Sequence, residues 1–87
     1  MVHGSMRITN KDVIKYIEDF LSGKDKPHDW DYFISVRIKN DPYLEAIRLK
    51  IGRLPDQYPP KAGGYCNEAG MNVLRQILSE LRSGDEL

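Results

Sequence analysis

The chain has 87 residues, with 13 Lys plus Arg against 13 Asp plus Glu, so its formal net charge is zero and bulk charge does not select its partner. One domain of this length buries about 60–65% of its unfolded surface, enough for a modest core but not for a large enclosed catalytic cleft. The apolar runs are too short for a membrane span, so we expect a cytoplasmic protein. The single cysteine, Cys66, excludes an internal disulfide and a Cys/His zinc site. We therefore expect no metal and no cofactor.

The first five residues, from Met1 to Ser5, precede a second methionine and are typical of a cloning remnant. We assign residues 6–87 to a single helical domain. Its first helix is expected to follow Thr9 or Asn10 as N-cap, with Asp12 in the first turn. Apolar residues then recur at intervals of three and four, and Gly23 supplies a left-handed stop; the apolar positions are Val13, Ile14, Ile17, Phe20 and Leu21.

A short helical turn is predicted next, with Asp29 as its cap. Trp30, Phe33 and Ile34 share one face of this turn, and we expect Trp30 to anchor the core. From Ile34 to Lys39 apolar and polar residues alternate, which is the period of a half-buried strand. Because no second strand is present to pair with it, we interpret this segment as an extended connector on the core. Pairing across a homodimer is the alternative.

The next helix is expected to begin with Asp41 as N-cap and Pro42 in the first helical position, and to end at Pro55. Its apolar stripe is Leu44, Ile47, Ile51 and Leu54. A Pro/Gly-rich loop precedes the last helix, which Asn67 is expected to cap and Gly84 to stop. The last stripe is Met71, Leu74, Ile77, Leu78 and Leu81. The sequence therefore predicts an all-α fold, a small bundle of three main helices plus the short turn.

Two groups of residues are candidates for a chemical site. Cys66 lies just before the cap of the last helix, where the helix dipole lowers a thiol pKa, so a thiol enzyme is our third hypothesis. No orienting motif accompanies this cysteine, and His28 is the one histidine outside the remnant. His28, Asp29 and Asp31 do not share a face, and nothing completes a metal site around them. We therefore expect no catalytic residue and no metal ligand.

A modest basic cluster supports a second hypothesis, a small nucleic-acid-associated regulator. The cluster has five cations against Asp41 and Glu45, a local charge of +3; the cations are Arg37, Lys39, Arg48, Lys50 and Arg53. This charge is weaker than the basic stripe of most DNA readers, and no recognition motif accompanies it. We therefore favour a solvated helix face and do not expect nucleic acid as the partner.

The loop before the last helix carries two tyrosines on a stiff proline segment, a surface suited to a protein partner. The predicted partner-binding residues are Tyr58, Pro59, Pro60 and Tyr65 of the loop, with Arg48 and Arg53 of the preceding helix. The alternative is that the two tyrosines cover the bundle.

Four segments of the chain, Trp30–Ile34, Asp41–Arg48, Leu54–Pro60 and Gly64–Gly70, resemble a family of small uncharacterised bacterial proteins. In size and helical layout the chain is also similar to small bacterial immunity proteins, which neutralise toxins by binding them. It departs from the colicin nuclease type, because those proteins present a strongly acidic face and this chain is neutral. The resemblance implies a non-catalytic module, immunity-type or regulatory, that binds and blocks another protein.

Overall fold

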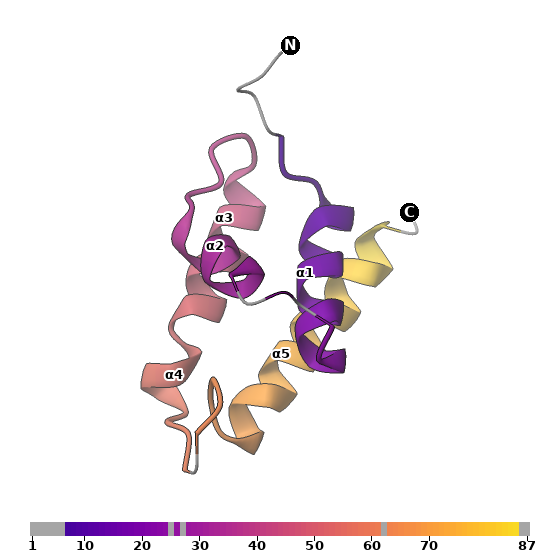
Figure 1. The fold of residues 1–87 in the computed structure, drawn as a ribbon. Helices are drawn as coiled ribbons and strands as arrows, with labels where there is room; N and C mark the ends of the chain where they lie inside the picture. Colours follow the sequence, from indigo (N-terminus) through magenta and orange to yellow (C-terminus); the bar gives the residue numbers. More distant parts are fainter. Residues whose placement is uncertain (1–6, 25, 27, 62, 86–87) are drawn as a thin grey trace.

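The computed structural model describes residues 7–24, 26, 28–61 and 63–85, and the remnant predicted at the start of the chain lies outside them. These residues form five helices and no strand (Figure 1). The helices are α1 (Asn10–Ser22), α2 (Asp29–Ser35), α3 (Pro42–Gly52), α4 (Leu54–Gln57) and α5 (Glu68–Asp85). The all-α prediction is confirmed.

The start of α1 and α3 and the end of α1 follow the predicted local rules. Thr9 and Asp12 form a reciprocal capping box at the start of α1, and Gly23 ends it in the left-handed conformation at φ 75°. The Asp41 carboxylate accepts hydrogen bonds from the N–H groups of Tyr43 and Leu44, at 3.0 and 3.1 Å. Each cap satisfies N–H groups that have no partner within the helix.

Three boundaries differ from the prediction. Asp29 lies inside α2, and its carboxylate accepts the Lys26 N–H at 3.2 Å instead of capping the helix. Pro55 does not end α3, which stops at Gly52; this proline lies in the first turn of α4, where its missing N–H costs nothing. Gly84 is part of α5 and does not have the positive φ of a glycine stop.

The alternating segment is partly helical. Ile34 and Ser35 belong to α2, and the chain becomes extended at Val36, with φ −103° and ψ 118°. We call residues 36–41, which join α2 to α3, the connector. The Ile38 side chain is buried in the core, whereas Arg37 and Lys39 on either side of it are exposed. The predicted extended connector is therefore correct for Val36 to Lys39 and wrong for Ile34 and Ser35, and its predicted core side is wrong for Val36, which is exposed.

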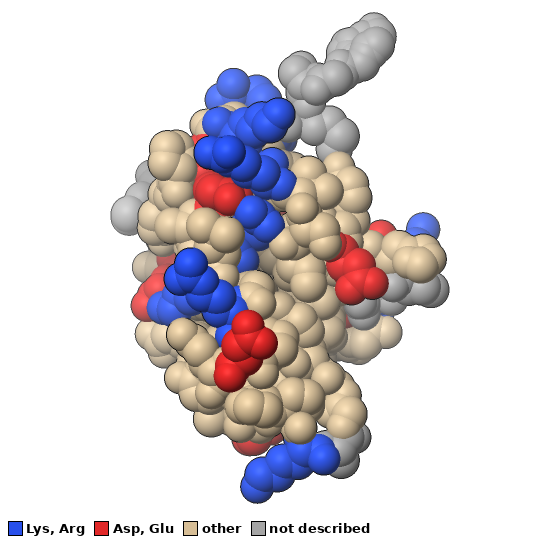
Figure 2. Space-filling view, turned by 90° about the vertical axis from the view of Figure 1, so that its left-hand side faces the viewer, with Lys and Arg blue, Asp and Glu red and all other residues tan. Residues whose placement is uncertain are grey.

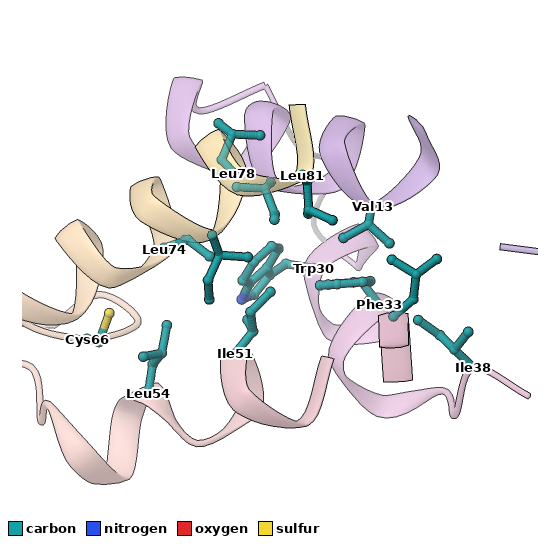
Figure 3. Close-up of a cluster of buried hydrophobic side chains, with 13 residues drawn as sticks. Val13, Trp30, Phe33, Ile38, Ile51, Leu54, Cys66, Leu74, Leu78 and Leu81 are labelled. Carbon is teal, nitrogen blue, oxygen red and sulfur yellow. The ribbon is translucent and has the colours of Figure 1, made fainter. Parts of the chain in front are cut away.

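The core lies between an antiparallel pair, α1 and α5, and the α3–α4 side of the molecule, with α2 crossing between them (Figure 1). Trp30 is buried at its centre, among aliphatic residues from every helix (Figure 3). Phe20 of α1 stacks on its indole ring with a centroid distance of 4.1 Å. This arrangement agrees with the predicted role of Trp30 as an anchor. It leaves the outer face of α3 without a helix against it (Figure 1).

Candidate interaction surface

The two loop tyrosines contact the bundle. The Tyr65 ring lies edge-on to Trp30, with centroids 5.4 Å apart, and its hydroxyl donates a 2.8 Å hydrogen bond to the Ile51 carbonyl. Burial raises the pKa of Tyr65 to about 12. Tyr58 is half-buried against the core, and its carbonyl accepts the Asn67 N–H at 2.9 Å. The structure thus gives both tyrosines the covering role that we stated as the alternative.

Three of the other predicted contact residues remain accessible. Pro59 and Pro60 are exposed in the loop, and Arg53 is exposed at the end of α3. Arg53 makes no ion pair with another described residue. These three residues are available to a partner.

Arg48 is not the exposed contact residue that the sequence analysis predicted. Its side chain is buried, with 9% of the residue's surface exposed, and its guanidinium binds the Glu45 carboxylate through two nitrogens at 2.8 and 2.7 Å. A third nitrogen donates to the Ile34 carbonyl at 2.6 Å. Arg48 therefore provides a hydrogen-bond donor to a carbonyl in the last turn of α2, and its side chain is not available to a partner.

Glu45 completes this buried pair. Its carboxylate also accepts the Ile38 N–H at 2.8 Å, so one carboxylate holds the connector to α3. The hydrogen bonds from Arg48 are the largest reason that the pKa of Glu45 falls to about 2, and the Ile38 N–H lowers it further against the opposing effect of burial. The pair fixes the connector in place and is unavailable as a basic patch.

Large hydrophobic side chains that remain exposed gather on one part of the described chain. Tyr32 and Val36 are 45% and 44% exposed, and Tyr43 and Leu49 on α3 are 56% and 43% exposed. All four lie between residues 32 and 49, whereas α1 and α5 expose none of this kind. Tyr32 and Val36 line a hollow next to α1, whereas Leu49 lines a hollow between the connector and α3, so the four side chains share one segment of the chain across two hollows. Scattered exposed hydrophobics are ordinary, but several of them in one short segment indicate a candidate contact region.

Cations surround this apolar cluster. Arg37, Lys39, Lys50 and Arg53 are exposed, and none pairs with a carboxylate among the described residues. With Arg48 and Glu45 cancelling each other, these four cations and Asp41 still give a local charge of +3. Figure 2 shows Lys and Arg side chains in a band on the side of the molecule where α3 lies.

We call the exposed residues of this segment the connector–α3 surface; they are Tyr32, Val36, Arg37, Lys39, Tyr43, Leu49, Lys50 and Arg53. A shallow hollow of about 530 Å³ lies within it, between the connector and the side chains of Ala46 and Leu49. The sequence did not single out its apolar members, because Tyr43 and Leu49 lie outside the buried stripe of α3 and Val36 was expected on the buried side of the alternating segment. The available signal was that Tyr43 and Leu49 are apolar residues outside this stripe.

The structure offers no support for catalysis at Cys66. The thiol is buried, and burial raises its pKa, opposite to what a nucleophile needs. Its sulfur packs close to Gly70, where an added Cβ would lie 2.7 Å from it. Within the described residues, no group of three or more potential metal ligands occurs around His28 or elsewhere.

Comparisons with protein-family models, with curated proteins and with solved structures found no significant match. The helices of the described chain are all too short or too polar to cross a membrane.

Proposed function

We propose that this chain is a non-catalytic protein-interaction module that binds its partner through the connector–α3 surface. The observation that carries the proposal is the gathering of all four exposed large hydrophobics of the described chain on residues 32–49. Burying such side chains against a partner is favourable, by about 25 cal/mol for each Å² of apolar surface. Their neighbours Lys50 and Arg53 suit the polar rim that surrounds such contacts.

The chemistry of the surface selects a partner that is acidic and partly apolar. Four exposed cations without carboxylate partners among the described residues attract Asp and Glu side chains, and this attraction speeds association and excludes basic partners. Tyr43 and Leu49 supply the apolar contact. Pro59 and Pro60 extend the exposed region beyond α4 and remain part of the proposal.

An immunity-type or regulatory role, in which binding blocks the partner, is the form of this function that we favour from the resemblance in size and helical layout. The positive charge of this surface indicates the charge of the partner that it would bind. Colicin-type immunity proteins present acidic faces to basic nucleases, whereas this surface is basic. The partner that this chain would block is therefore one whose own contact face is acidic.

The proposal is tested by comparing the proteins captured by three forms of the chain in cells that naturally produce it. The surface variant carries Tyr43→Ala, Leu49→Ala and Arg53→Glu, and the matched control carries Lys11→Glu and Gln76→Ala on exposed positions of α1 and α5. We expect at least one protein to be captured equally by wild type and control and at least tenfold less by the surface variant. Identical capture by all three forms would contradict the proposal.

A nucleic-acid-associated regulator remains the second candidate, because the same four cations are exposed and Lys and Arg side chains gather on this side of the molecule (Figure 2). Four phosphate contacts predict that log K falls by about 3 to 4 for each tenfold rise in salt. Binding of DNA or RNA at physiological salt that Arg37→Glu and Lys39→Glu abolish would favour this candidate. Capture that survives nuclease treatment favours the protein partner.

A further inference from the structure

The connector has one hydrogen-bonding edge directed into α3 and one that is open. Successive N–H groups of an extended chain point to opposite sides. The Ile38 N–H points toward α3, where it donates to Glu45 at 2.8 Å. The N–H and C=O groups of Arg37 and Lys39 form no hydrogen bond with another described residue, and in an extended chain they lie on the edge opposite to that of the Ile38 N–H. This is the arrangement of an edge strand that lacks its neighbour.

A hollow of about 400 Å³ borders this open edge, on the side of the connector that faces α1 and α2. Its wall is apolar and aromatic, formed by Ile8, Tyr16, Tyr32, Phe33 and Val36. The Asn40 side chain holds the other wall in place, since its amide donates to the Ile8 carbonyl at 2.9 Å and accepts the Ile8 N–H at 3.0 Å. The hollow is thus fixed on both sides and has a size suited to side chains of a bound segment.

The charged residues that line this hollow are all cations. Arg7, Arg37 and Lys39 line it and no carboxylate does, among the described residues. The carboxylates of Asp12, Asp19 and Asp29 line an adjoining hollow that shares Arg7, Ile8 and Tyr16 with it. None of the three cations forms an ion pair with another described residue. The wall therefore favours apolar side chains, and the rim favours Asp and Glu.

We infer that the open edge at Arg37 and Lys39, together with the hollow beside it, binds an extended acidic segment of the partner protein by β-strand addition. This inference rests on the proposed function and names the chemistry of its partner. Main-chain hydrogen bonds to the edge hold the segment, alternate apolar side chains enter the hollow, and acidic side chains meet the three cations. The edge offers two N–H and two C=O groups, enough to pair a segment of about four residues.

A second copy of this chain fits the edge poorly. Two copies that pair antiparallel about a two-fold axis at Arg37 place Arg37 opposite Arg37. An axis at Ile38 places Arg37 opposite Lys39. Like charges directly opposite one another destabilise a strand pair. The charge pattern therefore selects an acidic partner over self-pairing.

The probe for the test is a phage-displayed library of random ten-residue peptides, selected on the full chain. We expect enrichment of peptides in which Asp or Glu alternates with apolar residues. The best peptide is then made with N-methyl groups on alternate amides, which removes hydrogen-bond donors and keeps the side chains. N-methylation in one of the two alternate frames should weaken binding at least tenfold, and bound peptide should slow amide exchange at Arg37 and Lys39 at least tenfold.

Two variants of the protein complete the test. Lys39→Pro removes the N–H of the edge, and Lys39→Ala removes the charge but keeps that N–H; Lys39 is exposed, so both should melt close to wild type. We expect Lys39→Pro to bind the peptide at least tenfold more weakly than Lys39→Ala does. If Lys39→Pro does not fold, the N-methylated peptides decide.

The inference is overturned if no peptide is enriched, if the enriched peptides are basic, or if neither backbone change weakens binding. Slowed exchange on α3 in place of the connector would also overturn it. None of these results by itself removes the proposed function, which is tested separately by capture of a cellular partner through the connector–α3 surface. Binding of a nucleic acid through Arg37 and Lys39, with no peptide selected, would overturn both.

Discussion

Replacing Arg48 by Met tests the buried ion pair that joins α2, the connector and α3. Methionine keeps much of the side-chain volume but removes the three hydrogen bonds that Arg48 donates, two to Glu45 and one to the Ile34 carbonyl. Glu45 then keeps the Ile38 N–H and loses its cation. Removing one partner of a buried ion pair lowers stability more than replacing both partners by apolar residues does, because the remaining charge stays buried without compensation.

The magnitude follows from the pKa of Glu45, which falls from 4.5 to about 2 on folding. At 1.36 kcal/mol for each pKa unit, the shift corresponds to at most about 3 kcal/mol of stability. Both side chains keep a little contact with water, which screens part of this, so we expect the substitution to cost about 2–3 kcal/mol including the bond to Ile34. A domain of this size then melts about 10 °C lower or more.

The pH dependence has a definite sign. Because folding lowers the pKa of Glu45, its contribution is present above about pH 4.5 and is lost as the pH falls toward about 2. In Arg48→Met the pKa of Glu45 lies closer to its unfolded value, so the loss of stability between pH 4.5 and 2 should be smaller than in wild type. Urea unfolding at a series of pH values measures both the neutral-pH loss and this slope.

Arg75→Met is the matched control, because Arg75 pairs with Glu68 at 3.2 Å on the exposed surface of α5. Exposed pairs contribute about 0–1 kcal/mol, so this variant should melt near wild type. If Arg48→Met melts no lower than Arg75→Met and keeps the acid slope of wild type, the Glu45–Arg48 pair does not stabilise the fold.

Three further predictions concern the core and the thiol. Trp30→Ala should lower the free energy of unfolding by about 3–5 kcal/mol and unfold much of the protein, whereas Tyr43→Ala should change it by less than about 1 kcal/mol. Circular dichroism melts in which Tyr43→Ala is the less stable variant would contradict this prediction. Gly70→Ala should destabilise the protein by about 1–2 kcal/mol, because the added Cβ would lie 2.7 Å from the Cys66 sulfur. Gly52→Ala has open space around it and should be neutral or stabilising by up to about 1 kcal/mol. Equal denaturant midpoints for the two variants would contradict the close packing at Gly70. Because its pKa is raised, the buried thiol of Cys66 should react with a disulfide reagent at pH 8 at least about tenfold more slowly in the folded protein than in urea, and equal rates would show that it is accessible.

The features predicted correctly from the sequence are local ones. The caps at Thr9 and Asp41 and the left-handed Gly23 each depend on a few neighbouring residues, and the structure has them all. Pro55 shows the limit of a local rule, since proline breaks a helix interior but is tolerated in a first turn, and a new turn begins at Leu54.

The candidate surface was predicted less well, because it depends on which groups meet across the fold. In the sequence Arg48 is one cation of a basic cluster. In the fold it is buried, because the Ile34 carbonyl, 14 residues earlier in the chain, accepts a hydrogen bond from its guanidinium. Tyr65 looks like a loop contact until Trp30 and the Ile51 carbonyl cover its ring and hydroxyl. The Glu45–Arg48 spacing of three residues was the one local sign of the buried pair.

The most direct test of the proposed function is site-specific photo-crosslinking in cells that naturally produce the protein. A photoreactive phenylalanine analogue is placed at Tyr43 or Leu49 on the connector–α3 surface, and at Lys11 or Gln76 on the opposite helices, all of them exposed positions. We expect a discrete protein adduct of the same mass from Tyr43 and Leu49 and none from Lys11 or Gln76. Adducts from Lys11 and Gln76 alone, or no protein adduct at Tyr43 and Leu49, would contradict the claim that this side of the molecule binds a protein.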